Sequence, residues 1–466
     1  MLRLAYRCGS LFLSAALAAQ SAAAPAADEA LRAQFARYFA ADADGQRGFA
    51  FDRELDHELT TAAGDARLRA LVWQALQDHE RTRFAADHAA RIVRCGGLES
   101  AFTLQQVGER PANGWPLVIA MHGGGGVPQA VNDAQWRHMQ VYYRAQPQVG
   151  GYLYCALRAP NDAWNGFYFD GFYPLLETLI RQFVVCDAVD PDRVIAIGYS
   201  HGGYGAFAVG PKLPHRFAAV HASAAAPTDG ESSPVGLHTL PFSWMVGGED
   251  TAYGRRERCE AFAARIDALR REHVGFYPAT FTLVEGNGHT GLPDRDCLAQ
   301  LVPNVRAALP KQVWWEATDA VVQHHYWLCV PAPRKRLRID AVLEGQRLSV
   351  RWCDHAALDS LLVGADDAAA RERHVAATLA RARAVEAEVW LDARLVDLTQ
   401  PLAVTVAVAD DLDVTLVGSA EMRTTPTFTA RAARRVEPAP SLRTLCATMQ
   451  QRGDPVLAAS WILELH

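Results

Sequence analysis

The chain has 466 residues, of which 50% are hydrophobic and 21% are charged, and its formal net charge is -6. This length predicts two or three domains, and the composition is that of a soluble globular protein. No segment is strongly basic, which argues against a nucleic-acid partner.

Residues 1–26 have the pattern of a secretory signal peptide. Arg3 and Arg7 precede an apolar run, residues 11–19, and small residues follow as far as Ala26. A positive start, a short apolar stretch and small residues are the three parts of such a signal, so we expect a secreted or periplasmic protein. A membrane anchor or an ordinary N-terminal helix is the alternative, although the run is too short to span a bilayer. No other stretch is apolar enough for a membrane span.

Eight cysteines follow the predicted signal, and they are scattered along the chain. None forms a C-x-x-C pair, so we expect no structural zinc site. An oxidising compartment permits disulfides, for which Cys259 with Cys297 and Cys329 with Cys353 are candidate pairs. Buried free thiols are the alternative.

Residues 27–97 are expected to form a helical N-terminal region. Leu68, Leu71, Val72 and Leu76 share one helical face behind Asp65, a possible N-cap. No residue pattern here points to chemistry, so the predicted role is packing or spacing.

Residues 98–312 are expected to form the catalytic domain, because short apolar strands alternate with amphipathic helices. This alternation predicts the α/β class, with a mainly parallel sheet covered by helices on both faces. The predicted strands are 117–120, 152–157, 194–197, 217–221, 242–246 and 281–284, and the predicted helices are 172–185 and 259–269.

Residues 313–466 are expected to form a separate, mostly β domain. A hairpin is predicted where two alternating segments, 337–341 and 348–352, flank Glu344-Gly345-Gln346. Further strands are predicted near 358–363, 388–396, 402–408, 412–417 and 456–464, with an inserted helix at about 366–386 and another near 441–450.

The strongest motif is Gly198-Tyr199-Ser200-His201-Gly202-Gly203, directly after the predicted strand 194–197. A nucleophile on a sharp strand-to-helix turn needs small residues two before and two after it, because larger side chains would clash there. The turn presents the serine hydroxyl at the carboxyl end of the sheet. We therefore predict Ser200 as a nucleophile; a glycine-rich turn with a solvent-facing serine is the alternative.

A loop of glycines, His122-Gly123-Gly124-Gly125-Gly126, follows the predicted strand 117–120. Such a loop can aim backbone N–H groups at a bound substrate, so Gly123, Gly124 and His201 are the predicted oxyanion donors. A flexible loop or a phosphate cradle is the alternative. The loop lacks the G-K-[ST] ending of a phosphate loop and the spacing of a dinucleotide-binding fingerprint, which argues against the cradle.

Two further residues, Asp250 and His289, complete a catalytic set in which the serine, the acid and the base follow one another along the chain. Asp250 follows the predicted strand 242–246, and His289 lies on a glycine-rich turn after the strand 281–284. Both positions lie at the carboxyl edge of a parallel sheet, where Ser200 is also expected. Glu249 is the neighbouring competitor for the role of the acid.

These four motifs together resemble the α/β-hydrolase superfamily. Residues 98–312 are similar to secreted esterases (feruloyl esterases and polyhydroxyalkanoate depolymerases), to dienelactone hydrolases and to prolyl-oligopeptidase-type catalytic domains. The resemblance implies Ser200 as nucleophile, His289 as general base and Asp250 as its orienting acid. A prolyl oligopeptidase has a β-propeller before this domain, whereas residues 27–97 of this chain look helical. Dienelactone hydrolases use cysteine as the nucleophile, where this chain has Ser200.

Aromatic residues supply the candidate binding surfaces. Trp164 lies in the segment 161–168, which follows the strand 152–157 at the predicted catalytic edge, and Tyr199 precedes the nucleophile. We predict both as substrate-binding residues, although segment 161–168 would also serve as a packed supporting loop. Near the start of the C-terminal region, four aromatics predict either a carbohydrate site or an interface core: Trp314, Trp315, Tyr326 and Trp327.

The sequence thus predicts a secreted serine hydrolase that cleaves small or polymeric carboxylic esters without a metal or organic cofactor. The alternatives are a serine peptidase of prolyl-oligopeptidase-like type and a non-enzymatic binding protein. The natural ester, the role of the C-terminal region and the oligomeric state are left open.

Overall fold

A computed structural model describes residues 27–354, 385–417, 421–430 and 432–465, with the pairs 376–377, 379–380 and 382–383. The predicted signal peptide, the strand near 358–363 and most of the inserted helix 366–386 lie outside these residues. Within them, no helix is both long and apolar enough to cross a membrane.

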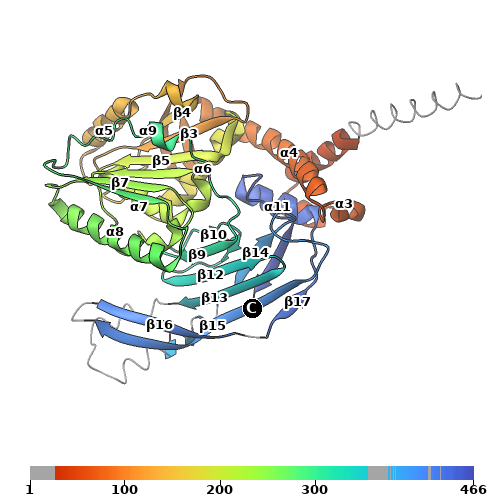
Figure 1. The fold of residues 1–466 in the computed structure, drawn as a ribbon. Helices are drawn as coiled ribbons and strands as arrows, with labels where there is room; N and C mark the ends of the chain where they lie inside the picture. The colour runs from red at the N-terminus through yellow and green to blue at the C-terminus, as the bar shows by residue number, and fades with distance from the viewer. Residues whose placement is uncertain are drawn as a thin grey trace, which may run out of the picture.

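The main sheet has eight strands in the order β1-β2-β4-β3-β5-β6-β7-β8 (Figure 1). Strand β2 runs antiparallel to β1 and β4, and the strands from β4 to β8 are parallel to one another. The mainly parallel sheet predicted from the sequence is therefore confirmed. Its strands are β1 (Ile92–Cys95), β2 (Leu98–Val107), β3 (Trp115–Met121), β4 (Tyr152–Leu157), β5 (Val189–Tyr199), β6 (Ala219–Ser223), β7 (Phe242–Gly247) and β8 (Ala279–Val284).

Helices cover both faces of this sheet, because its central strands are apolar on both sides. In β3, Leu117 and Ile119 belong to one core, whereas Val118 and Ala120 belong to another. The first core packs against α6 (Phe172–Cys186), α7 (His201–Lys212) and α8 (Arg255–Glu272), and the second against α5 (Gln129–Tyr142) and α9 (Leu298–Leu301).

Three features of the main sheet were not predicted. Strand β1 joins the sheet before residue 98, so the sheet begins earlier than the expected boundary. Strand β2 lies near the sheet edge and is only partly buried, which removes the apolar run that marks a central strand. Helix α5 buries only Asn132 and Met139, so no apolar stripe reveals it.

The N-terminal region is helical, as predicted. It contains helical residues 27–40, α2 (Ala43–Gly48), α3 (Arg53–Glu58) and α4 (Ala62–Ala89). The proposed cap at Asp65 was wrong: Thr61 caps α4 by accepting the Gly64 N–H (3.1 Å), and Asp65 pairs with Arg69 instead. The buried face of α4 packs against α11 (Leu442–Arg452) through Leu442, Leu445 and Met449.

The C-terminal region holds two smaller sheets (Figure 1). One runs β16-β15-β13-β12-β9, with β17 also paired to β15; the other runs β10-β11-β14-β18. The segments 402–408 and 412–417 form one strand with a register shift between Ala409 and Asp411. The strands are β9 (Gln312–Glu316), β10 (His324–His325), β11 (Leu328–Cys329), β12 (Leu337–Glu344), β13 (Arg347–Asp354), β14 (Ala387–Leu391), β15 (Leu402–Val417), β16 (Glu421–Ala430), β17 (Arg434–Val436) and β18 (Trp461–Leu465).

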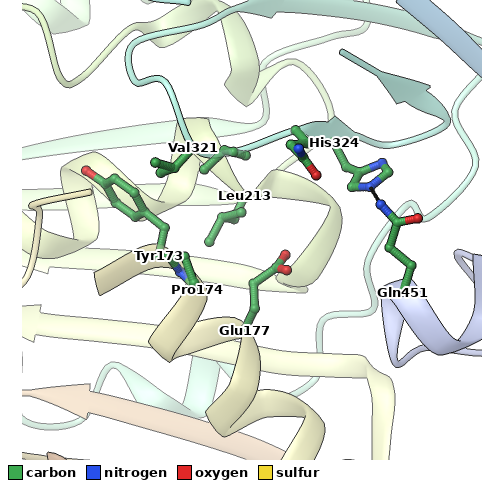
Figure 2. Close-up of a pocket in the computed structure, with 9 residues that line it drawn as sticks. Tyr173, Pro174, Glu177, Leu213, Val321, His324 and Gln451 are labelled. Atoms are coloured by element: carbon green, nitrogen blue, oxygen red, sulfur yellow. Dashed lines mark hydrogen bonds between the residues drawn. The ribbon is translucent and has the colours of Figure 1, made fainter. Parts of the chain in front are cut away.

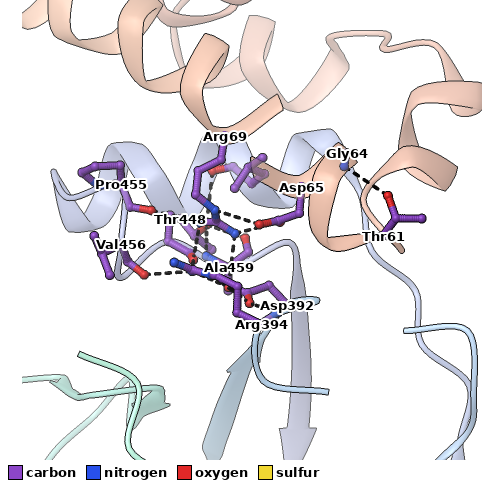
Figure 3. A network of polar contacts seen from close by, with 12 residues as sticks. Thr61, Gly64, Asp65, Arg69, Asp392, Arg394, Thr448, Pro455, Val456 and Ala459 are labelled. Atoms are coloured by element: carbon purple, nitrogen blue, oxygen red, sulfur yellow. Dashed lines mark hydrogen bonds and ion pairs between the residues drawn. The ribbon is translucent and has the colours of Figure 1, made fainter. Parts of the chain in front are cut away.

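A buried polar network ties the N-terminal helix to the C-terminal region (Figure 3). The Arg69 guanidinium donates to both carboxylate oxygens of Asp65 (2.8 and 3.0 Å) and to Asp392 Oδ2 (3.1 Å). It also donates to the Pro455 and Ala458 carbonyls. Residues more than 300 positions apart are thereby held together, which gives residues 27–97 a structural role.

Buried side chains decide two alternatives left open by the sequence. All eight described cysteines are free, so neither Cys259–Cys297 nor Cys329–Cys353 is a disulfide in this structure. The four aromatics Trp314, Trp315, Tyr326 and Trp327 are buried in apolar cores rather than displayed on a surface.

Candidate active site

Ser200 stands on the turn between β5 and α7, with backbone angles φ 54° and ψ -115°. A non-glycine residue with positive φ is strained, and such strain concentrates at functional sites. The glycines around it are required sterically. A Cβ atom at Gly198 would lie 2.0 Å from the Gly202 oxygen, and one at Gly202 would lie 2.1 Å from the Met121 oxygen. The turn therefore closes only because both positions lack side chains.

The structure brings Ser200, His289 and Asp250 together at the carboxyl edge of the main sheet. His289 Nε2 lies 3.0 Å from Ser200 Oγ, and His289 Nδ1 lies 2.8 Å from Asp250 Oδ2. Asp250 is 3% exposed, whereas the competing Glu249 is exposed to solvent. The His289 side chain remains 37% exposed, so solvent and substrate have access to it.

The glycine loop after β3 lies beside Ser200. Gly125 N–H donates to Asn132 Oδ1 (2.8 Å) and Gly126 N–H to the Asp162 carbonyl (2.8 Å). In the described residues, the N–H groups of Gly123, Gly124 and His201 have no such acceptor. A Cβ atom at Gly123 would lie 3.6 Å from Ser200 Cβ, which places this glycine against the serine.

Two buried histidines support this loop. His122 Nε2 accepts the Ala159 N–H (3.0 Å), so its Nδ1–H donates to the Gly123 carbonyl (2.6 Å). Burial lowers the pKa of His122 to about 4 and that of His201 to about 3, which keeps both rings neutral. The His201 ring packs beneath the loop, because a Cβ atom at Gly125 would lie 2.5 Å from it.

Arg255 is a site residue that the sequence analysis missed. Its Nη1 donates to Asp250 Oδ1 (2.8 Å) and its Nε to the Tyr204 hydroxyl (3.0 Å), and the residue is buried. One carboxylate oxygen of Asp250 thus contacts His289, and the other accepts a hydrogen bond from the Arg255 guanidinium. Nothing in the local sequence marks Arg255, which lies among several arginines at the start of α8.

The two predicted substrate-binding aromatics have different surroundings. Trp164 is 39% exposed, and its ring lies 6.4 Å from the His201 ring. The Tyr199 hydroxyl donates to the His289 carbonyl, and its ring lies 5.1 Å from the Tyr142 ring. Tyr199 therefore braces the His289 turn, and a contact with substrate stays a prediction for both residues.

The strand order β1-β2-β4-β3-β5-β6-β7-β8, with β2 antiparallel and a serine turn after β5, defines the architecture. The chain has an α/β-hydrolase fold. The side chains placed after β7 and β8 in this fold, Asp250 and His289, meet at the serine turn. Among the residues that the structure covers, no group of three or more potential ligands could hold a metal ion.

No family model matches the sequence, and a search of curated proteins found no match. The chain is similar to several solved hydrolases over less than half of its length. A thermostable esterase is 18% identical over 42% of this chain and 54% of its own (TM-score 0.34). A ferulic acid esterase is 18% identical over 44% of this chain and 91% of its own (TM-score 0.32). A putative dipeptidyl aminopeptidase IV from Bacteroides ovatus is 14% identical over 45% of this chain and 34% of its own (TM-score 0.34).

A hollow lies away from Ser200, between α6 and the C-terminal region (Figure 2). This cavity of about 230 Å³ is lined by Tyr173 and Glu177 of α6, by the segment 321–324 and by Gln451 of α11. The Glu177 carboxylate accepts from Arg216 Nε (3.0 Å), and Gln451 Nε2 lies 3.1 Å from His324 Nε2. No serine or cysteine lines this hollow, so it lacks the chemistry of the site at Ser200.

Proposed function

We propose that the protein is a secreted serine hydrolase that cleaves carboxylic esters. The observation that carries the proposal is the continuous chain from Ser200 Oγ through both ring nitrogens of His289 to Asp250, with contacts of 3.0 and 2.8 Å. A base within hydrogen-bond reach of a hydroxyl, itself oriented by a carboxylate, is the arrangement that activates a serine. The secreted location rests on residues 1–26 alone.

The proposed reaction begins when Ser200 Oγ attacks the ester carbonyl and His289 Nε2 takes the hydroxyl proton. The tetrahedral intermediate collapses, and the C–O bond to the alcohol breaks while His289 returns the proton to the leaving oxygen. Water then repeats both steps on the acyl-enzyme and releases the carboxylic acid. Asp250 holds the Nδ1–H tautomer and stabilises the imidazolium formed in each half.

The carbonyl oxygen becomes negative in this intermediate and needs donors. The N–H groups of Gly123, Gly124 and His201 supply them in the proposal, because Gly125 and Gly126 already use theirs inside the loop. His201 is the first residue of α7, so the positive end of the helix dipole adds to the same stabilisation.

The test compares three proteins on two substrate types. Wild type, Ser200→Ala and the matched control Ser349→Ala, an exposed serine in β13, are assayed on simple esters and on an aminoacyl amide. We expect ester turnover by wild type and the control, and a loss of at least about 10³-fold in Ser200→Ala at unchanged melting temperature.

Two results would overturn this proposal. Ester turnover that survives in Ser200→Ala would remove Ser200 from the mechanism. Turnover of the amide without any ester would favour the peptidase alternative instead.

A further inference from the structure

Two exposed aromatic side chains lie together at the catalytic edge. Of the large apolar side chains that are exposed in the described ranges, only Trp164 and Tyr253 are aromatic, with 39% and 71% of their surfaces exposed. They come from different loops, one after β4 and one after β7, yet their ring centroids are 5.3 Å apart. Large aromatic surface left in water is costly, so its concentration at one place points to a ligand.

This aromatic pair adjoins the glycine loop beside Ser200. A Cβ atom at Gly126 would lie 3.8 Å from Cε3 of Trp164, so the indole stands against the loop that holds Gly123 and Gly124. The Trp164 ring also contacts the Tyr204 ring, with centroids 5.3 Å apart. A flat group placed on the pair therefore lies beside the loop that carries the proposed oxyanion donors Gly123 and Gly124.

Tyr253 is held in a strained backbone conformation although most of its ring is exposed. Its φ is 59° and its ψ is 19°, in the left-handed region that bulky residues avoid, and its ring is mostly in solvent. The Arg255 guanidinium lies 5.0 Å from the ring centroid, and Arg255 is itself fixed by Asp250 and Tyr204. An observed outlier of this kind supports a functional role for the side chain that it presents.

We propose that Trp164 and Tyr253 form a stacking surface for an aromatic ring in the ester substrate. This inference rests on the proposed function and adds the class of substrate to it. Stacking on two tilted rings contributes to transition-state binding through buried apolar area and ring geometry. The structure thereby assigns Tyr253, which no sequence motif marks, as a specificity-determining residue.

The surroundings favour an aromatic ring over a sugar or a cation. Two polar side chains beside Trp164 are already engaged: Asn161 Oδ1 accepts the Ala163 N–H (3.0 Å), and Asp162 Oδ1 accepts hydrogen bonds from Asn132 (2.9 Å) and Arg158. A sugar needs such groups free for its hydroxyls. The Arg255 guanidinium already lies over the Tyr253 ring, so that face of the ring is not available to a cationic ligand.

The experiment measures a ratio of kcat/KM values. The two esters of each pair differ in one half only. Ethyl cinnamate and ethyl butyrate share the alcohol, phenethyl acetate and ethyl acetate share the acid, and an acetylated sugar is a further substrate. We expect wild type to prefer the aromatic member of at least one pair, and Trp164→Ala and Tyr253→Gly to reduce that preference about tenfold. Tyr253→Gly also relieves the positive φ, so its melting temperature should not fall.

Controls separate this inference from the proposed function. Trp164→Phe and Tyr253→Phe keep a ring and should retain most of the preference. Val274→Ala, at an exposed position just beyond the C-terminal end of α8, should retain all of it. An unchanged preference in Trp164→Ala and Tyr253→Gly, or a loss confined to the acetylated sugar, would overturn the stacking surface. Binding of ethyl cinnamate to Ser200→Ala, followed by Trp164-dependent fluorescence, distinguishes a failure of the stacking surface from a failure of the proposed function. Saturable quenching in this variant, without ester turnover by wild type, would support the stacking surface and reject the ester hydrolase.

Discussion

Two buried aspartates show how the same residue types serve different purposes in two regions. At the catalytic edge, Asp250 accepts from Arg255 and from His289, whose other nitrogen faces the Ser200 hydroxyl. At the junction between α6, the residues after α7 and the C-terminal region, Asp454 accepts from Arg216 Nη1 (3.2 Å) and Arg306 Nη2 (3.1 Å). Asp250 connects through a histidine to the half-buried Ser200 hydroxyl, whereas Asp454 accepts from two buried guanidinium groups and from the Val456 and Leu457 N–H groups.

The electrostatics of the junction explain this difference. Burial alone would raise the pKa of Asp454, but the guanidinium groups of Arg306 and Arg216 outweigh it and hold that pKa far below its usual range. A carboxylate so firmly ionised cannot exchange a proton near neutral pH. We infer that the junction joins the main sheet to the C-terminal region, whereas the catalytic edge keeps a partly exposed histidine within reach of the Ser200 hydroxyl.

The largest expected effect is on activity at the catalytic edge. Asp250→Asn leaves the side-chain shape intact but offers His289 an amide in place of a carboxylate, so it should lower kcat on esters by roughly 10³- to 10⁴-fold. Glu249→Gln, one residue away and exposed, is the matched control and should keep wild-type kcat. Steady-state kinetics with both variants check this; comparable losses in both would contradict the assignment of the acid.

The corresponding change at the junction should act on stability instead. Asp454→Asn removes the buried carboxylate that Arg216 and Arg306 share and leaves them only Glu177 and Asp192, which should lower the free energy of unfolding by about 3 kcal/mol. Urea denaturation measures this, with the exposed Asp410→Asn as control. A loss of activity in Asp454→Asn without a loss of stability would contradict the difference between the junction and the catalytic edge.

Arg255→Met tests the cation beside Asp250. Loss of a charge-assisted hydrogen bond should reduce kcat/KM about 10- to 100-fold. Arg271→Met, exposed near the end of the same helix, should leave kcat/KM unchanged. Wild-type kcat/KM in Arg255→Met would contradict a role for Arg255 in holding Asp250.

The smallest effect per unit of pH concerns two buried histidines, His215 and His238. Burial lowers the pKa of His215 and of His238 to about 3, against 6.5 for the ordinary side chain. The unfolded chain therefore binds more protons than the folded protein between these values. Each histidine should remove about 1.4 kcal/mol of stability per pH unit as the pH falls from 6.5 towards 3. Urea midpoints at several pH values measure this slope; His215→Asn should flatten it, and the exposed His57→Asn should not.

Sequence reasoning predicted the elements that carry strong local patterns. The apolar runs of β3, β4 and β7 and the stripe of α6 reveal buried structure, and the glycines around Ser200 reveal a turn with no space for side chains. It missed β2 and α5, whose burial is partial, and split β15 at an irregular register.

The site residues Arg255 and Tyr253 were not predicted for a different reason. Arg255 contacts Tyr204 of α7, and Tyr253 contacts Trp164 of the loop after β4. Neither their spacing nor their neighbours in the chain reveal those contacts. The strained φ of Tyr253 is a property of the folded backbone alone. Side chains whose roles arise only from three-dimensional proximity leave no signal in one sequence.

The most direct measurement of the central claim is covalent labelling with a fluorophosphonate, followed by intact mass and peptide mapping. We expect a single adduct on Ser200, absent in Ser200→Ala and much slower to form in His289→Ala. Labelling of a different residue, or an equal adduct on Ser200→Ala, would contradict it.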